Sequence, residues 1–403
     1  MAEKTQVRLA TGKKVNTAID DPVNFFTSAT LQNRANLLSG LLDGISNGIQ
    51  TINAASSGID AITKLVQSAQ ATIRQALNDA AQNRPSRTGT TALASPAEVS
   101  TLNKSAQDIA LDKKLGTGAA DGAGVAATST DTGHLGIQVG SAVTVAAGNT
   151  TYSFNTTATM TVRDLVAEIN KSGIATASVD TSGKLSITGT GSDALRFSVA
   201  NTGTDNLGFA AADVTAMGTG ITATANSAIR TGLIDQFNTL RTQIGKLADD
   251  AGYNGTNLLD GNLLKIVFNE KTGGSRNTLD IQGFTITADA LGIQPAANAT
   301  STGYTNFQND IDLNNADEAL TNALSTLRGM ASTLGANLAV VQSRQDFTKS
   351  MMTTLKTGAD NLVLADSNEE GANLLALQTR QQLSQTALSL ASQADQSVLR
   401  LFG

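Results

Sequence analysis

The longest regular pattern of apolar positions occupies the first quarter of the chain, where every seventh residue is a large aliphatic one. The members of this series are Leu31, Leu38, Ile45, Ile52, Ile59, Val66 and Ile73. A seven-residue apolar repeat sustained over so many turns predicts a long helix that supercoils with partner helices. At ~1.5 Å per residue this helix is roughly 65 Å long, too long for the core of one compact domain. The row four residues on turns polar at Ser56, Thr63 and Gln70, so we expect a single apolar row at mid-helix.

A second repeat of the same period lies near the other end of the chain. Its members are Leu313, Leu320, Leu327, Leu334 and Val341, and the series resumes at Leu355 after a break at Thr348. The two apolar stripes match in length, and each needs a partner surface. We therefore predict a mainly α fold, in which both ends of the chain build a long antiparallel coiled-coil shaft.

Between the two repeats the chain becomes rich in Gly, Thr, Ser and Ala, and short stretches alternate as strands do. Residues 162–171 form an amphipathic helix pattern, and residues 176–188 read as a hairpin. This middle part predicts an inserted outer α+β domain. The expected divisions are 1–20 (part of an inner core and a linker), 21–112 (N-terminal shaft helices), 113–226 (outer domain), 227–304 (third shaft helix and hairpin), 305–357 (C-terminal shaft helix) and 358–403 (inner-core helix).

The last helical pattern carries a narrow apolar stripe with Gln and Ser on its other faces. Its candidate assembly residues are Leu383, Ala387, Leu390, Ala394, Val398 and Leu401. A helix with so narrow a stripe is only marginally stable alone, so we expect neighbouring helices to cover it.

Composition narrows the classes of function. The 403 residues include no Cys, no Trp, one His and 3% aromatic residues, and the net charge is −6. Few aromatic residues leave few anchors for a ligand pocket, and the acidic balance argues against nucleic acid as a partner. No apolar run reaches the length of about 18 residues that a membrane span needs. The sequence shows no basic segment followed by an apolar run, which is the pattern of a cleaved Sec-type signal.

Candidate catalytic chemistry is sparse. His134 is the single histidine, so it cannot belong to a multi-His metal site, and we expect it at the surface. Adjacent acids such as Asp20 and Asp21 lie near predicted helix ends, where capping explains them. The glycines near 116–124 lack the lysine of a phosphate-binding loop. The sequence therefore predicts no enzyme, no metal and no cofactor.

Several motifs resemble those of one known family. Residues 8–21 (RLATGKKVNTAIDD), 253–259 (YNGTNLL), 331–344 and 384–402 are similar, in order and spacing, to segments of bacterial flagellin. The resemblance covers about 1–112 and 228–403. Flagellins carry a longer segment before the first motif. We therefore expect either that this sequence starts inside the family's N-terminal helix, or that the chain lacks the first part of that helix. By position, the family's animal-receptor segment corresponds to residues 68–71, which lack its charges.

The resemblance implies a structural subunit that self-assembles into the extracellular flagellar filament used for motility. It also implies export without a cleaved Sec signal, and partners among the export chaperone, the filament cap and the hook-associated proteins. Two alternatives stay open at this point. One is a hook–filament junction protein, which shares the terminal architecture, and the other is a cell-surface flagellin-like protein whose outer domain binds a glycan.

Overall fold

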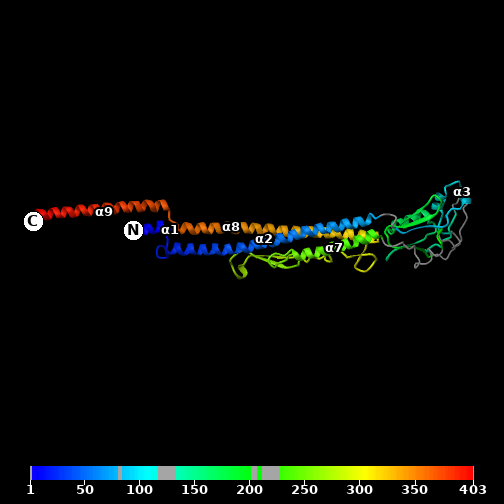
Figure 1. Cartoon of the computed structure of the whole chain (residues 1–403), viewed down its shortest axis with the longest axis horizontal. Coiled ribbons are helices and arrows are strands. Elements are labelled where there is room, and N and C mark those ends of the chain that lie inside the picture. The colour runs from blue at the N-terminus through cyan, green and yellow to red at the C-terminus, as the bar shows by residue number, and fades with distance from the viewer. Residues whose placement is uncertain (1, 80–83, 117–132, 201–206, 211–226, 403) are drawn as a thin grey trace.

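The protein is a long rod with an outer domain at one end and a single helix projecting from the other (Figure 1). The computed structural model describes residues 2–79, 84–116, 133–200, 207–210 and 227–402. Both chain ends lie at the same end of the rod, far from the outer domain. This arrangement follows from the two long helices, which run the length of the shaft in opposite directions.

The shaft is built on α2 (Pro22–Leu77) and α8 (Asp310–Val363), which lie side by side and antiparallel. Helix α2 begins where the sequence predicts: the Asp21 side chain accepts a hydrogen bond from the backbone N–H of Asn24, and Pro22 occupies the first helical turn. Helix α8 begins with Asn309, whose side chain accepts from the N–H of Ile311. The expected mainly helical fold with an antiparallel shaft is confirmed.

The two seven-residue series meet inside the shaft. From Ile45 to Ile73 the first series is buried, as is the whole of the second from Leu313 to Val341. Leu38 packs with Leu355 in a separate small cluster, against which the half-buried Leu31 lies. Thr348 is buried at the break in the series, and its hydroxyl donates to the carbonyl of Arg344 one turn earlier.

The expectation of a single apolar row at the middle of α2 is wrong. A second buried row lies three residues after the first, and its members are Gly48, Ala55, Ile62, Ala69 and Ala76. Most of these side chains are small, so they add little to an apolar periodicity. They allow a third shaft element to approach α2 closely.

That third element is α7 (Ala228–Asp250) together with a hairpin of β7 (Leu263–Val267) and β8 (Thr278–Gln282), joined through the short turn η2 (Gly273–Ser275). A Cβ atom placed on Gly48 would lie 2.5 Å from Ile266 Cδ1. One placed on Gly58 would lie 2.7 Å from the Cβ of Ala251. The Ile266 side chain can turn away from a Cβ at position 48, but the Cβ of Ala251 cannot, so the close contact requires glycine at position 58.

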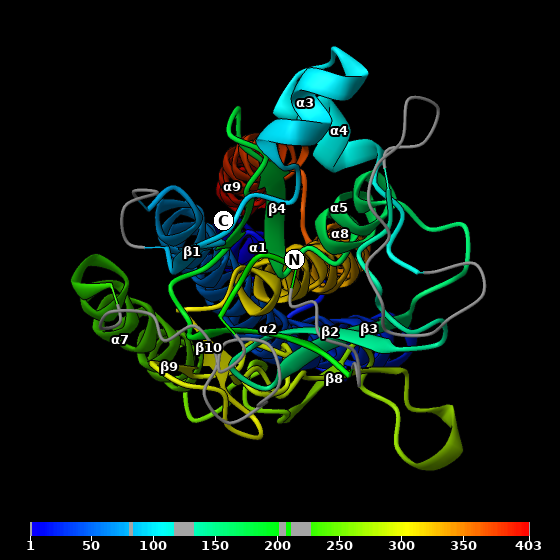
Figure 2. The same cartoon turned by 90° about the vertical axis from the view of Figure 1, so that its right-hand side faces the viewer.

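The described part of the outer domain contains two three-stranded antiparallel sheets and α5 (Val162–Lys171) (Figure 2). One sheet has the order β1 (Ser86–Thr88), β5 (Leu185–Gly189), β4 (Ala175–Val179), and the other has β3 (Thr150–Asn155), β2 (Ala142–Ala147), β6 (Leu195–Val199). Helix α5 has the bounds that the sequence predicts, with a capping box between Thr161 and Asp164. Its buried residues Leu165 and Ile169 share the outer core with both sheets.

Residues 86–112 differ from the sequence-based division, which assigns them to the shaft. Strand β1 pairs with β5, and α3 (Pro96–Leu102) and α4 (Ala106–Asp112) lie in the outer domain (Figure 2). Ile109 and Ala110 are buried in its core. The segment 96–112 forms two helices, because Asn103 ends α3 in a left-handed conformation (φ 51°) and Ser105 caps the start of α4. Two such short helices cannot continue a heptad.

At the opposite end, α1 (Ala2–Thr11) packs against the start of α9 (Ser367–Phe402). The segments that link them to the shaft are joined by backbone hydrogen bonds, from Lys14 N–H to the carbonyl of Val363 (2.7 Å) and from Ala365 N–H to that of Gly12 (2.9 Å). Gly12 ends α1 with φ +65°, a conformation that glycine adopts without strain. Among the described helices, none combines the length and apolar character that crossing a membrane requires.

Candidate assembly surfaces and the junction of shaft and outer domain

Helix α9 projects beyond the shaft, and its apolar stripe has no cover within the part of the chain that the structure describes (Figure 1). Leu383 is 65% exposed, Leu390 61% and Val398 53%. Ala387 and Ala394 are also exposed, and the Leu401 side chain lies outside the described residues. A stripe of this kind, exposed in one chain, is the feature expected of a surface that other molecules cover.

The base of α9 is held by ionic contacts with the N-terminal segment. Arg8 donates to Glu370, with Nη1 3.0 Å from Oε1; the Glu370 side chain is largely buried and that of Arg8 partly so. Lys4 lies 3.2 Å from Asp20. The lysine and the N–H groups of Asn16 and Thr17 lower the pKa of Asp20 to about 2. The first turns of α9 are therefore fixed to the shaft, whereas the rest of the helix extends away from it.

A second group of exposed apolar side chains lies at the same end of the shaft, and the sequence analysis missed it. Ile19 is 95% exposed, and Val23, Phe26 and Phe347 are each more than half exposed. The available signal was their position, because large apolar residues that fall outside a helix's buried stripe are candidates for a contact surface. With the α9 stripe they give this end of the rod an extended uncovered apolar surface.

The predicted shaft-packing residues lie inside the chain and not on an exposed surface. From Ile45 to Ile73 and from Leu313 to Val341 they lie in one continuous core within the chain. They therefore hold α2, α7 and α8 together and are not available to a neighbouring molecule.

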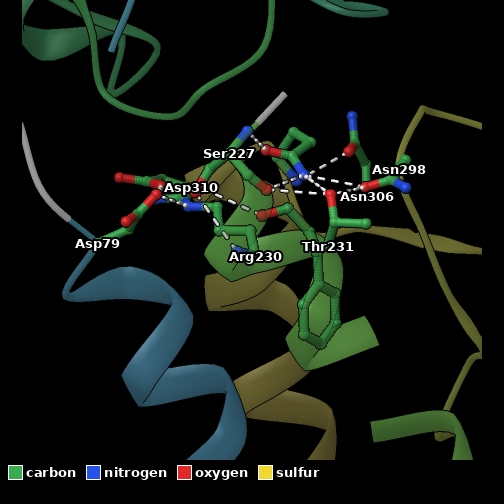
Figure 3. A network of polar contacts seen from close by, with 9 residues as sticks. Asp79, Ser227, Arg230, Thr231, Asn298, Asn306 and Asp310 are labelled. Carbon is green, nitrogen blue, oxygen red and sulfur yellow. Dashed lines mark hydrogen bonds and ion pairs between the residues drawn. The ribbon is translucent and has the colours of Figure 1, made fainter. Parts of the chain in front are cut away.

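At the other end, one buried arginine lies where the shaft meets the outer domain (Figure 3). Arg230, in the first turn of α7, is completely buried. Its Nη2 lies 2.7 Å from Oδ1 of Asp310, and its Nη1 donates to the carbonyl of Phe307 at 3.1 Å. Its Nε lies 3.6 Å from Asp79, which follows the end of α2. One guanidinium thus ties the ends of three shaft helices together.

A network of amides extends from Arg230 toward the outer domain (Figure 3). The Gln308 side chain accepts from the N–H of Ser227 and donates to Asn298, each at 3.0 Å. The carbonyl of Gln308 accepts from the N–H of Ser192 in the outer domain at 2.7 Å. Asn309 donates to the carbonyl of Ala147, also in the outer domain, at 3.2 Å. The outer domain is therefore fixed to the start of α8 by many short contacts.

The junction holds more carboxylates than cations. Burial raises the pKa of Asp193, whose carboxylate accepts from Asn306 at 2.6 Å, and the nearby charge of Asp312 raises it further. Burial also raises the pKa of Asp312 and, against the opposing effect of Arg230, that of Asp310.

This junction was not predicted from the sequence. One signal was available, since Arg230 is three residues before Leu233 and so falls on the apolar stripe of its helix. His134, predicted at the surface, is instead half-buried beside Lys114. The described residues contain no group of three or more His, Cys, Asp or Glu side chains placed to hold a metal ion.

The geometry defines a class of proteins in which both chain ends form one helical shaft, an outer domain is inserted between them, and the terminal helix is left uncovered. Family models match both terminal parts of the chain. Residues 1–110 match the model of the bacterial flagellin N-terminal helical region, and residues 313–402 match that of the C-terminal helical region. The chain belongs to the bacterial flagellin family.

Individual flagellins share part of the sequence. Flagellin FljM of Caulobacter vibrioides is 36% identical over 173 residues, which are 42% of this chain and 59% of that protein. Flagellin FljK of the same organism is 34% identical over 171 residues, with the same coverage. A flagellin of Brucella melitensis is 28% identical over 169 residues, 41% of this chain and 60% of its own length. The chain thus spans about three-fifths of the length of these three relatives.

Proposed function

We propose that this protein is a structural subunit that self-assembles into a helical flagellar filament outside the cell and serves motility. The observation that carries the proposal is the uncovered apolar stripe of α9, from Leu383 to Val398. Burying a leucine side chain that is otherwise exposed stabilises a contact by ~1.5–3 kcal/mol. Covering this stripe is therefore a strong driving force for association.

The shape of the molecule favours an open polymer over a closed pair. The α9 stripe and the exposed group at Ile19, Val23 and Phe26 differ in residues and in setting, so neither is a copy of the other. Contacts between unlike surfaces give head-to-tail assemblies, which form rings when the rotation closes and filaments when it does not. The rigid junction at Arg230 holds the outer domain at the far end from these surfaces.

The same proposal covers the remaining properties that the family resemblance implies. They are a structural, non-catalytic role, export without a cleaved Sec signal, and contacts with an export chaperone, the filament cap and hook-associated proteins. No specific observation favours either a hook–filament junction role or glycan binding.

The test replaces apolar residues of the stripe in the full chain, with Leu383→Ser and Leu390→Ser combined. Both side chains are exposed in the single chain, so we expect the monomer to keep its circular dichroism and melting temperature. In the proposed filament both leucines are buried, so losing them should raise the critical concentration for polymerisation by more than about tenfold. Sedimentation and electron microscopy of the products measure this.

The matched control is Gln381→Ser with Gln385→Ser, which alters the opposite side of the same helix. We expect this control to polymerise as the parent does. Unchanged polymerisation of the double Leu variant, or equal loss in both variants, would contradict the proposal.

A further inference from the structure

A cleft opens between α7, the first turns of α8 and the loops that precede α8. Its volume is about 270 Å³. Phe237, Ile293 and Ala316 form buried parts of its wall, and its polar groups include those of Tyr304, Asp312 and Asn315. The volume is slightly below the range of ~300–1,000 Å³ that is typical for sites of drug-sized ligands. The cleft therefore suits a group the size of an amino-acid side chain.

The charge in this cleft is uncompensated. Asp312 is the one ionisable carboxylate among its lining residues, and it forms no ion pair with any residue that the structure describes. Its Oδ2 accepts a single long hydrogen bond, 3.4 Å from the N–H of Asn306. Its position in the first turn of α8 gives it some support from the helix dipole. That support does not replace the water that burial has removed, because burial still raises its pKa.

The surroundings add to this negative potential. The charge of Asp312 raises the pKa of Asp193, so the two carboxylates repel each other. Arg241 of α7 contacts the wall, where it donates to the carbonyl of Ile293 at 2.9 Å, but it is paired with Asp289. Arg230 is paired with Asp310 and Asp79. Both guanidinium groups are thus occupied by other acids.

The rim carries an aromatic ring. Tyr304 is 47% exposed and lines the cleft. An exposed tyrosine ring attracts a cation placed over its face, while the aliphatic part of the same ligand packs on apolar walls such as those of Phe237 and Ala316. A carboxylate, an aromatic ring and a small apolar wall together match a cation on a short alkyl chain.

We infer that this cleft binds an organic cation, an alkylammonium or guanidinium group, whose charge pairs with the carboxylate of Asp312. Two sources supply this chemistry: a free small amine, or a lysine or arginine side chain of a second copy of the protein. A bound cation neutralises Asp312 and removes its repulsion of Asp193, so binding also stabilises the junction of the shaft and the outer domain.

The experiment uses the full chain as a monomer. Ligand-observed nuclear magnetic resonance measures the binding of two cations, agmatine and n-butylamine. The neutral probe 1-butanol has the same alkyl length as n-butylamine and serves as the ligand control. We expect the two cations to bind and 1-butanol to bind at least about tenfold more weakly, because a hydrogen bond to a charged group contributes that much.

Two variants localise the binding. Asp312→Asn should weaken the binding of agmatine at least about tenfold, and Tyr304→Ser should weaken this binding severalfold. Glu318→Gln removes a carboxylate from an exposed position of α8 outside the cleft and should leave binding unchanged. Absence of agmatine binding to the parent, equal binding of 1-butanol, or equal effects of Asp312→Asn and Glu318→Gln would overturn the inference.

Assembled filaments distinguish the two sources. If agmatine binds monomer and filament alike, the ligand is a free amine. If agmatine binds the monomer but not the filament, and Asp312→Asn filaments dissociate at lower salt than Glu318→Gln filaments, a side chain of a second copy fills the cleft. Since the monomer titration does not depend on assembly, its outcome is separate from that of the polymerisation test.

Discussion

Arg230 and Asp310 form an ion pair of 2.7 Å between the first turn of α7 and the first turn of α8. Arg230 is completely buried and the Asp310 side chain largely so, and the same guanidinium also faces Asp79 at the end of α2. Removing one partner of a buried pair leaves an uncompensated charge, which typically costs about 3–5 kcal/mol.

We therefore expect Arg230→Ala to lower the free energy of unfolding by about 3–5 kcal/mol, because Asp310 then loses the guanidinium that pairs with it in a largely buried site. Arg328→Ala, at an exposed position of α8, should change it by less than about 0.5 kcal/mol. Denaturant titrations of the two variants measure the difference. Equal stabilities would mean that the junction does not depend on this charge.

A second prediction concerns two glycines of α2. Gly58→Ala places a Cβ 2.7 Å from Ala251 and from Leu259, and overpacking of this kind typically costs about 1–3 kcal/mol. Gly40 lies in the same helix, and a Cβ atom placed on it meets no other atom within 4 Å, so Gly40→Ala should stabilise the protein by up to about 1 kcal/mol. Melting temperatures that move in opposite directions are expected. A shift of the same sign in both would contradict the close packing of α7 on α2.

The third prediction tests the heptad core. Ile52→Ala removes a completely buried side chain and should destabilise the shaft by about 2–5 kcal/mol. Lys64→Ala changes an exposed side chain of the same helix and should alter stability by less than about 0.5 kcal/mol. Circular dichroism at increasing denaturant concentration distinguishes them. If the Lys64 variant is the less stable one, the assignment of the stripe is wrong.

The fourth prediction concerns pH. The pKa of Asp193 is raised in the folded chain, so its protonated form favours folding and its ionisation disfavours it. The contribution of Asp193 to the stability of the folded chain is fully favourable below the ordinary pKa of 3.8, and it is lost as the pH rises through the raised pKa. Asp193→Asn should therefore be more stable than the parent at pH 7, and this advantage should shrink as the pH falls toward 4.

Asp20 supplies a control of opposite sign. Its pKa is lowered to about 2, so its contribution is present above the ordinary value of 3.8 and disappears as the pH falls toward 2. Asp20→Asn should be less stable than the parent at pH 7. Denaturation midpoints over a pH series measure both variants, and a common sign at pH 7 would refute the assignment of the two environments.

The sequence predicted those parts of the fold that repeat or carry a local signal. The heptads of α2 and α8, the cap formed by Asp21 and Pro22, and the bounds of α5 depend on neighbouring residues and were confirmed. The buried row that includes Ala55 and Ala69 escaped because small side chains fit both exposed and buried positions.

Neighbouring residues in the sequence do not show whether residues 86–112 belong to the shaft or to the outer domain. Strand β1 consists of Ser86, Arg87 and Thr88, which show no apolar alternation, and only pairing with β5 about a hundred residues later puts it in the outer domain. Of the candidate site, the stripe of α9 followed from periodicity. The junction at Arg230 did not, because its partners Asp79 and Asp310 come from distant parts of the chain.

The antiparallel arrangement of α2 and α8 also has a mechanical consequence. The chain leaves the shaft for the outer domain and returns from it at one tip, while both termini lie at the other end. A pulling force on the termini acts on α2 and α8 in the same direction and reaches the inner links first, where the hydrogen bonds of Lys14 and Ala365 join the two segments. The outer domain lies beyond the closed end of this loop, off the path between these links, so we expect that it can differ in size without weakening the shaft.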